Sequence, residues 1–580
     1  MNLVTANNKT LWSKNKKNLL LGNWCVNNLH RYQKKNKKNY LISDYHWTNK
    51  SKFKKDLKYL YKVYILILDN LCKHLNKFHN TKYPKRYWEI LLHRWLWLYL
   101  YMLYDRWEIV RSIESKNKNL SSKIFSYDSV NFIPKDSWEF TKSFMYSDDW
   151  NHWIYSEIFK FNKKINYKII NKKKIKPKFL YKVGEYESLN SLIRPFTLSS
   201  KEDQVYFQNT YFSKRFEIVY RLFNRQFFIN KKIPLENLDI NLDLLKRKDF
   251  EKSSHIKDKF AKFAYNLLKY QLPKIYLEYY YPTQKLIKKI PLPKNPKYIL
   301  TSIDTTYNDA FKMYTADKVL KGSKLFVIQH GGSYGIADFS KYEEIEIKIS
   351  DKFLTWGWNQ KNKKVQPFFL QKTAYKKVRK KKNASGLVLP ITEFYLSPNQ
   401  PLYFGAPGNK MDMNKYIDNI VSFLSYTNKN ILNLSSIKSF ENIKSQYILN
   451  SLKFKFPKLK YINPTKATYS VSKNYKLVVE TANSSNFLEC LNLNIPIILI
   501  YDQQYISIRK SAVKDFQMLK KAKIIHNSPE EAAKFVNQNY YNLEEWWNSK
   551  SLQKVKNKFC YKFARRSSSP MQDLKKILNK

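Results

Sequence analysis

The sequence predicts an α/β fold whose C-terminal half holds a mainly parallel sheet with helices on both faces. From residue 298 onward, short apolar runs typical of buried strands alternate with segments of helical periodicity. Four of only ten glycines lie between Gly322 and Gly335, directly after one such run. Glycine suits backbone that approaches a ligand closely, and ligands of open α/β sheets bind at the carboxyl ends of strands. The glycine cluster is therefore the first candidate site.

The composition is that of a folded globular protein. Hydrophobic residues make up 43% of the chain and aromatic residues 16%, which excludes a disordered chain. The length of 580 residues suggests two to four domains. No two cysteines have the C-x-x-C spacing of a zinc or redox site, so we expect reduced thiols and no disulfides; the four are Cys25, Cys72, Cys490 and Cys560.

The formal net charge of +60 suggests a nucleic acid or an anionic membrane as a partner. However, only 14 of the 106 basic residues are arginine, the residue that nucleic-acid readers favour, and the lysines are spread along the whole chain. Lysine, asparagine and isoleucine are also what an AT-rich genome encodes. We interpret the charge mainly as composition bias on solvated faces, with attraction to anionic lipid or phosphate-bearing substrates as a secondary effect.

The N-terminal half reads as rich in aromatic helices. The first 18 residues are polar and show no secretory signal, so we expect a cytoplasmic protein. The longest apolar stretch, residues 95–104, is too short to span a bilayer and indicates a buried helix. The expected elements are a short strand within 18–25, helices at 59–79, 88–109, 207–228 and 260–281, and an exposed lysine-rich segment at 162–178.

Prolines at 291–296 mark a boundary, after which the βαβα pattern begins. We therefore divide the chain into an N-terminal domain (1–290), a C-terminal domain (291–545) and a helical tail (546–580). The expected strands are 298–302, 325–329, 353–356, 387–389, 476–479 and 496–500, and the expected helices are 306–319, 414–426, 486–493 and one that follows Ser528.

His330 and the glycines around it follow the strand at 325–329. The imidazole could act as a general base or donate to a phosphate. Alternatively, His330 is a purely structural histidine in a tight turn. Of the three glutamates that follow (Glu343, Glu344 and Glu346), we assign Glu346 to the cleft and the others to solvent. Trp356 and Trp358 alternate on a strand end; one could face a sugar, although a core position suits both.

A second candidate site follows the strand at 476–479. Ser484, Ser485 and Asn486 open a helix whose free N–H groups and positive dipole end suit phosphate. Glu489 then falls on the first turn and could accept from ribose hydroxyls, or it could simply be a capping glutamate. We expect this site and His330 to lie in the same sheet, within one ligand's length of each other.

Several segments give the chain a resemblance to a known family. In the C-terminal half they are residues 329–335 (QHGGSYG), 350–358, 485–489 with 494–496, and the pair Trp546–Trp547; in the N-terminal half they are residues 21–25, 45–47, 87–88 and 149–152. These segments resemble a family of transferases encoded in O-antigen and other surface-carbohydrate loci. The C-terminal half is similar to spore-coat polysaccharide proteins and CDP-glycerol glycerophosphotransferases. The family usually carries Gly-Pro near the position of His93–Arg94.

The resemblance implies a GT-B-like glycosyltransferase of bacterial lipopolysaccharide or surface-polysaccharide biosynthesis. Two Rossmann-like halves would face a cleft, with the acceptor bound by the helix-rich N-terminal half and a nucleotide-activated donor by the other. His330 and Glu346 would be catalytic. The implied donor-binding residues are Gly331, Gly332, Tyr334, Gly335, Ser484, Ser485, Asn486 and Glu489; the acceptor-side residues are Asp149 and His152.

We expect no cofactor and no metal. Asp148–Asp149 could be a metal-binding pair only in a GT-A fold. From the residues alone we expect His152 in a buried aromatic network with Trp150 and Trp153, and the acceptor-side role stays open. The expected acceptor is a glycan or a lipid-linked glycan, with a peripheral position at the inner face of the membrane and no nucleic-acid partner. A nucleotide-sugar 2-epimerase and a basic nucleic-acid-binding protein stay open as alternatives.

Overall fold

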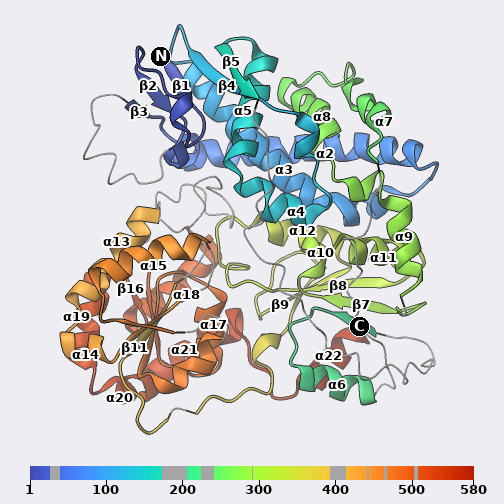
Figure 1. Cartoon of the computed structure of the whole chain (residues 1–580). Helices are drawn as coiled ribbons and strands as arrows, with labels where there is room; N and C mark the ends of the chain where they lie inside the picture. Colours follow the sequence, from blue (N-terminus) through green and yellow to red (C-terminus); the bar gives the residue numbers. More distant parts are fainter. Residues whose placement is uncertain are drawn as a thin grey trace.

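A computed structural model describes residues 1–25, 40–172, 205–223, 241–290, 292–379, 381–391, 413–439, 443–462, 467–501 and 507–579. Within these residues the strands form three sheets, and every strand pair in them is parallel. The predicted parallel α/β fold with Rossmann-like sheets is therefore confirmed. The sheets lie in three units, which we call the N-terminal, middle and third units (Figure 1).

The N-terminal unit contains a sheet of which the sequence analysis predicted only one strand. Its order is β3-β2-β1-β4-β5. The strands are β1 (Asn2–Val4), β2 (Asn18–Leu20), β3 (Tyr40–Ile42), β4 (Ser121–Ser126) and β5 (Asn166–Lys172), and the helices are α2 (Lys50–Phe78), α3 (Lys85–Glu114), α4 (Ser137–Lys142), α5 (Asp148–Asn162), α7 (Leu244–Lys248), α8 (Lys259–Gln271) and α9 (Tyr280–Lys288). The lysine-rich segment predicted at 162–178 is exposed at 163–164 and 166–169, much of it on the edge strand β5; its residues 173–178 lie outside the described ranges.

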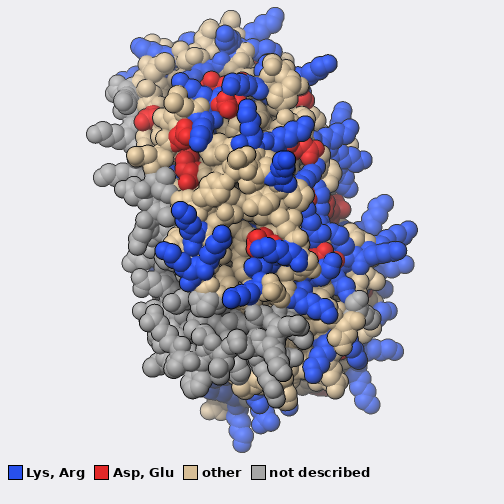
Figure 2. Space-filling view, turned by 90° about the vertical axis from the view of Figure 1, so that its right-hand side faces the viewer, with Lys and Arg blue, Asp and Glu red and all other residues tan. Residues whose placement is uncertain are grey.

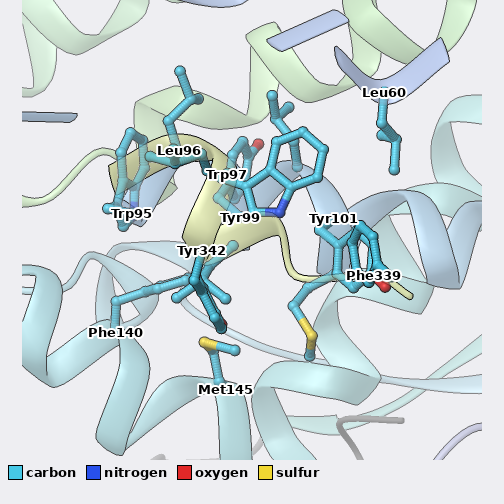
Figure 3. Packing of buried hydrophobic residues seen from close by; sticks show 14 of the residues in the cluster. Leu60, Trp95, Leu96, Trp97, Tyr99, Tyr101, Phe140, Met145, Phe339 and Tyr342 are labelled. Carbon is cyan, nitrogen blue, oxygen red and sulfur yellow. The ribbon is translucent and has the colours of Figure 1, made fainter. Parts of the chain in front are cut away.

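Helix α3 is buried on almost every side, as its apolar sequence predicts. Trp95 and Tyr99 stack on each other at 5.5 Å between ring centroids. Phe339 and Tyr342, from the middle unit, lie among the aromatic side chains of α3 (Figure 3). Helix α3 thus joins the cores of two units. None of the helices in the described ranges combines the length and apolarity needed to cross a membrane.

The middle unit has the strand order β10-β9-β8-β7-β6. Its strands are β6 (Val205–Gln208), β7 (Tyr298–Thr301), β8 (Lys324–Ile328), β9 (Lys352–Thr355) and β10 (Val365–Pro367), and its helices are α6 (Lys214–Phe223), α10 (Asp304–Tyr307), α11 (Asp309–Leu320), α12 (Lys341–Ile349) and α22 (Pro570–Leu578). Because β6 pairs with β7, the predicted boundary at residue 290 falls within a sheet. The helix predicted at 207–228 was wrong at its start, where Phe207 lies in β6, and its residues 224–228 lie outside the described ranges.

The third unit has the strand order β13-β12-β11-β14-β15-β16. Strands β12 and β13 are added on one side of β11 and strands β14 to β16 on the other, so the order of the strands reverses between β11 and β14. Ligands of open α/β sheets bind at such a switch point. The strands are β11 (Leu387–Pro390), β12 (Ser436–Lys438), β13 (Lys460–Ile462), β14 (Leu477–Glu480), β15 (Ile497–Ile500) and β16 (Ile525–His526), and the helices are α13 (Met413–Tyr426), α14 (Lys429–Asn433), α15 (Ile443–Lys455), α16 (Thr468–Val471), α17 (Ser485–Asn492), α18 (Lys510–Lys521), α19 (Pro529–Asn539), α20 (Leu543–Asn548) and α21 (Lys550–Phe563).

The chain end packs back on the middle unit. Leu574 and Leu578 of α22 are buried in one cluster with Phe207 of β6 and Phe326 of β8, and α22 lies beside this sheet in Figure 1. All four cysteines are free, as predicted, and all four are buried. On the face that Figure 2 shows, Lys and Arg are spread over the described surface and far outnumber the acids.

Replacing Leu574 with Ala should destabilise the middle unit by about 2–5 kcal/mol, because a fully buried leucine leaves a cavity. The matched control is the exposed neighbour Lys575, whose replacement with Ala should have almost no effect. Urea unfolding followed by tryptophan fluorescence measures both. Equal midpoints for Leu574→Ala and wild type would contradict the docking of α22.

Candidate active site

The two sequence-predicted parts of the site belong to different sheets. His330 lies two residues beyond β8, at the carboxyl end of the middle sheet, whereas Ser484 precedes α17 beyond β14 of the third sheet. The expectation of a single sheet was therefore wrong. The parts nevertheless meet, because a Cβ atom on Gly332 would lie 2.5 Å from the Ser484 carbonyl oxygen and 2.8 Å from the Ser485 nitrogen. The candidate site lies where the middle and third units touch.

Gln329 fixes the loop that carries His330. Its Oε1 accepts hydrogen bonds from the Trp358 indole (2.7 Å) and the Trp356 backbone N–H (2.9 Å). Its Nε2 donates to the Gly331 carbonyl at 2.8 Å. Both tryptophans are buried, so the core position holds for both and neither presents a face to a sugar. The loop is thus held before any ligand arrives.

The rest of the loop needs glycine for a physical reason. Gly335 has φ +73°, and a Cβ there would lie 2.4 Å from the Trp358 ring. Its N–H donates to Glu343 at 2.7 Å. Glu343 also pairs with Arg509 of the third unit at 3.0 Å, so the expectation that Glu343 faces solvent was wrong. This glutamate ties the glycine loop of one unit to the other unit.

His330, Glu346 and Tyr334 form a close group. Nδ1 of His330 lies 3.8 Å from Oε2 of Glu346, and Nε2 lies 3.5 Å from the Tyr334 hydroxyl. Burial, together with the charges of Arg94 and Lys372, lowers the pKa of His330 to about 3. Burial raises the pKa of Glu346 to about 8, against the opposing effect of Arg94. At neutral pH a neutral imidazole therefore lies beside a largely protonated carboxyl group.

The start of α17 is arranged differently from the sequence expectation. Ser484 is the N-cap, and its Oγ accepts from the Phe487 N–H at 3.3 Å. Glu489 is consequently the fifth helical residue, so neither the first-turn position nor the capping alternative holds. Its Oε1 lies 3.5 Å from Nζ of Lys372, in the middle unit. Because the charge of Lys372 also reaches His330, Lys372 links the two parts of the site.

Sequence reasoning gave Glu480 no role, yet it lies at the switch point of the third sheet. It is the last residue of β14 and is fully buried. Burial raises its pKa to about 8, and hydrogen bonds from Ser484 and Asn486 oppose that shift. A charged residue ending an otherwise apolar strand was the available signal, since buried acids need a partner or a function.

The acceptor-side residues lie in the N-terminal unit. The buried His152 uses both ring nitrogens, because Nε2 accepts from the Phe125 N–H at 3.1 Å and Nδ1 lies 2.5 Å from Thr5 Oγ1. Its ring packs on Phe125 and Tyr127, and this aromatic network extends to Trp153. Asp149 accepts from the Tyr127 hydroxyl at 3.0 Å. These internal contacts give the predicted acceptor role no support.

One group among the described residues has the composition of a cation site. His46, Asp56 and Glu108 bring ligand-type atoms within 4.8 Å of one another. The ammonium group of Lys52, however, already pairs with both carboxylates, at 2.7 Å from Glu108 Oε2. This group is therefore a buried ion-pair network of the N-terminal unit, and Asp148 and Asp149 do not belong to it.

Solved structures similar to this chain include glycosyltransferases and epimerases. A putative UDP-N-acetylglucosamine 2-epimerase from Listeria monocytogenes shares 9% identity over 80% of this chain and 95% of its own, with a TM-score of 0.32. The wall teichoic acid polymerase TagF shares 9% identity (67% and 94% covered, TM-score 0.29), and the glycosyltransferase of kitacinnamycin shares 8% (64% and 90%, TM-score 0.27).

No curated protein is similar enough in sequence to match this chain. A family model does match: that of the LIC12162 family transferase, over residues 1–578. The match thus extends over all three units.

Replacing Gly332 with Ala should push the His330 loop away from α17, because the new Cβ meets the backbone of Ser484. We expect a loss of stability on the order of 1–3 kcal/mol, as for other overpacked contacts. Gly331→Ala is the matched control, since a Cβ there comes no closer than 3.8 Å to Tyr334. Thermal unfolding measures both. A Gly332→Ala protein as stable as Gly331→Ala would show that the two units do not meet here.

Glu346 should make stability fall as pH rises. Its pKa is near 4.5 when unfolded and about 8 when folded, so the folded state holds a proton that the unfolded state has lost. This contribution is complete below pH 4.5 and disappears as pH approaches 8. Relative to Glu346→Gln, the wild-type free energy of unfolding should fall by about 1.4 kcal/mol per pH unit in this window. Urea titrations at several pH values test this, and parallel curves would contradict it.

Proposed function

The chain belongs to the LIC12162 family of transferases, and we propose that it transfers a sugar or a polyol phosphate from a nucleotide-activated donor to a glycan or lipid-linked acceptor. The observation that carries the proposal is the contact between the Gly332 loop and the start of α17. This contact brings His330, a residue able to accept a proton, close to a helix N-terminus, which favours phosphate. An attacking hydroxyl needs a group that accepts its proton, and a leaving nucleotide needs a group that stabilises its phosphate.

In this proposal the third unit binds the donor. The dipole of α17 and the N–H groups near Ser485 and Asn486 stabilise the phosphate, and the ammonium group of Lys372 adds positive charge from the middle unit. Glu489 accepts from the ribose hydroxyls. These groups take the place that a divalent metal has in other transferases, so the reaction needs none.

His330 acts as the general base. The acceptor hydroxyl attacks the donor carbon or phosphorus, its proton passes to the imidazole, and the bond to the leaving phosphate oxygen breaks with its electron pair. A base works best with a pKa near the working pH, whereas burial and neighbouring positive charges hold the pKa of His330 at about 3. A bound anionic substrate raises the pKa of a neighbouring imidazole, so the histidine becomes an effective base only once the site is filled.

We assign the acceptor to surface-polysaccharide or O-antigen biosynthesis, where acceptors are commonly lipid-linked. The excess of lysine gives the surface a general attraction to anionic lipid, each residue near such a surface adding about 1 kcal/mol at most. A peripheral position at the membrane is therefore compatible with the charge.

Replacing His330 with Asn should lower turnover by about 10²–10⁴-fold while nucleotide affinity stays near wild type. The assay measures nucleotide release from a panel of nucleotide-activated sugars and CDP-glycerol, with lipid-linked and free glycans as acceptors. His255→Asn is the matched control, because His255 is exposed and contacts Asn70, far from the site in the N-terminal unit. No turnover of any donor by wild type, or full activity of His330→Asn, would refute the assignment.

The same assay in excess chelator tests the metal-free reaction. We expect unchanged turnover. Activity that is lost with chelator and restored by magnesium or manganese would instead favour metal assistance.

A further inference from the structure

Arg94 is a buried cation with unused hydrogen-bond donors. It lies in α3 of the N-terminal unit and is 3% exposed. Its guanidinium carbon lies 3.2 Å from the ring centroid of Tyr342 and 5.5 Å from that of Tyr307. Nη2 is 3.5 Å from the Tyr307 hydroxyl, and Nε and Nη1 have no hydrogen-bond partner. This position lies in the interior of the helix.

Helix α12 connects Arg94 with His330, Glu346 and Tyr334. Tyr342 and Glu346 are four residues apart on α12 and therefore share a face of that helix. The charge of Arg94 contributes to lowering the pKa of both His330 and Glu346, so both lie within its electrostatic reach. An element of the N-terminal unit thus reaches the carboxyl end of the middle sheet.

The positive charge of Arg94 has no carboxylate partner at ion-pair distance in the described part of the chain. Aromatic faces compensate a guanidinium only in part, and a buried charge without a counter-ion is costly. Glu346 does not supply the counter-charge at neutral pH, because burial keeps it largely protonated. Nearby, Lys372 is already paired with Glu489. The charge of Arg94 therefore lacks an anionic partner among these residues.

We propose that Arg94 binds an anionic group, a phosphate or a carboxylate, of a substrate beside His330. The inference rests on the proposed function only in taking the anion to be part of a substrate. Arginine is suited to these groups because its planar fork bonds two oxygens at once. The anion reaches Arg94 from solvent by passing His330, whose side chain is 13% exposed. Once bound, it raises the pKa of His330 toward the range of a working base.

The test uses inorganic pyrophosphate in calorimetric titrations of wild type, Arg94→Gln, Arg94→Lys and Arg111→Gln. We expect Arg94→Gln to bind pyrophosphate at least about tenfold more weakly, the loss expected for charged hydrogen bonds, and Arg94→Lys to recover part of it. Arg111 lies on the same helix but is 64% exposed and pairs with Glu108, so its variant should bind as wild type does. Equal affinity in wild type and Arg94→Gln, or no binding by wild type, would overturn the proposal.

A second readout does not depend on the folding of the variants. In wild type, pyrophosphate should shift the NMR titration of His330 to higher pH, whereas an unshifted titration at saturating pyrophosphate contradicts the proposal. His330→Asn identifies the resonance. Circular dichroism of each Arg94 variant shows whether its binding data can be compared with wild type.

Further titrations identify the source of the anion. If Arg94→Gln weakens binding of UDP and CDP as much as pyrophosphate, the anion is the donor phosphate. If it weakens glucuronate or glycerol phosphate but spares the nucleotides, the anion belongs to the acceptor. Glu489→Ala should weaken the nucleotides and spare pyrophosphate. If wild type binds nucleotides but Arg94→Gln binds every anion as tightly as wild type does, this inference fails and the proposed function stands. If wild type binds no nucleotide, the proposed function fails.

Discussion

The burial of α3 on nearly all sides is the constraint on which the architecture depends. The middle of this 30-residue helix, residues 95–104, carries large apolar side chains on every side and is not stable in water unless other elements cover it. The N-terminal unit covers part of α3 and the middle unit covers the rest, so the two units share one core. Each polar side chain on the helix then needs its own partner. Asp105 pairs with Arg106 at 2.7 Å, and Glu108 pairs with Lys52. Arg94 has no carboxylate partner at ion-pair distance among the described residues, and its charge reaches the candidate site.

Sequence patterns predicted the strands that are buried on both faces. Strands such as β8 and β15 are continuous apolar runs of four to five residues, and their expected positions match within one residue. The N-terminal sheet was largely missed, because β1, β2 and β3 have three residues each and show no periodicity. Strand β6 was taken for the start of a helix, since its aromatic run fits both periods and only its pairing with β7 decides.

The candidate site was predictable only where local rules apply. The scarcity of glycine pointed to Gly332 and Gly335, and both allow a close approach that a side chain would block. Helix-start chemistry indicated a cap within residues 484–486, and Ser484 provides it. What local rules could not provide was contact between segments distant in the chain. Gly332 meets Ser484 from another sheet, and Arg94 of the N-terminal unit packs on Tyr342 of the middle unit, so neither neighbour was visible before the fold was known.

The return of α22 to the middle sheet has a consequence for how the protein is made. The core of that sheet needs Phe207, near the first third of the chain, and Leu574, near its last residues. The third unit lies between these two in sequence and has its own hydrophobic cluster. During synthesis on the ribosome, this unit can therefore pack while the middle sheet still lacks its last helix. The candidate site, which needs both units, takes its final form only after α22 has packed on the middle sheet.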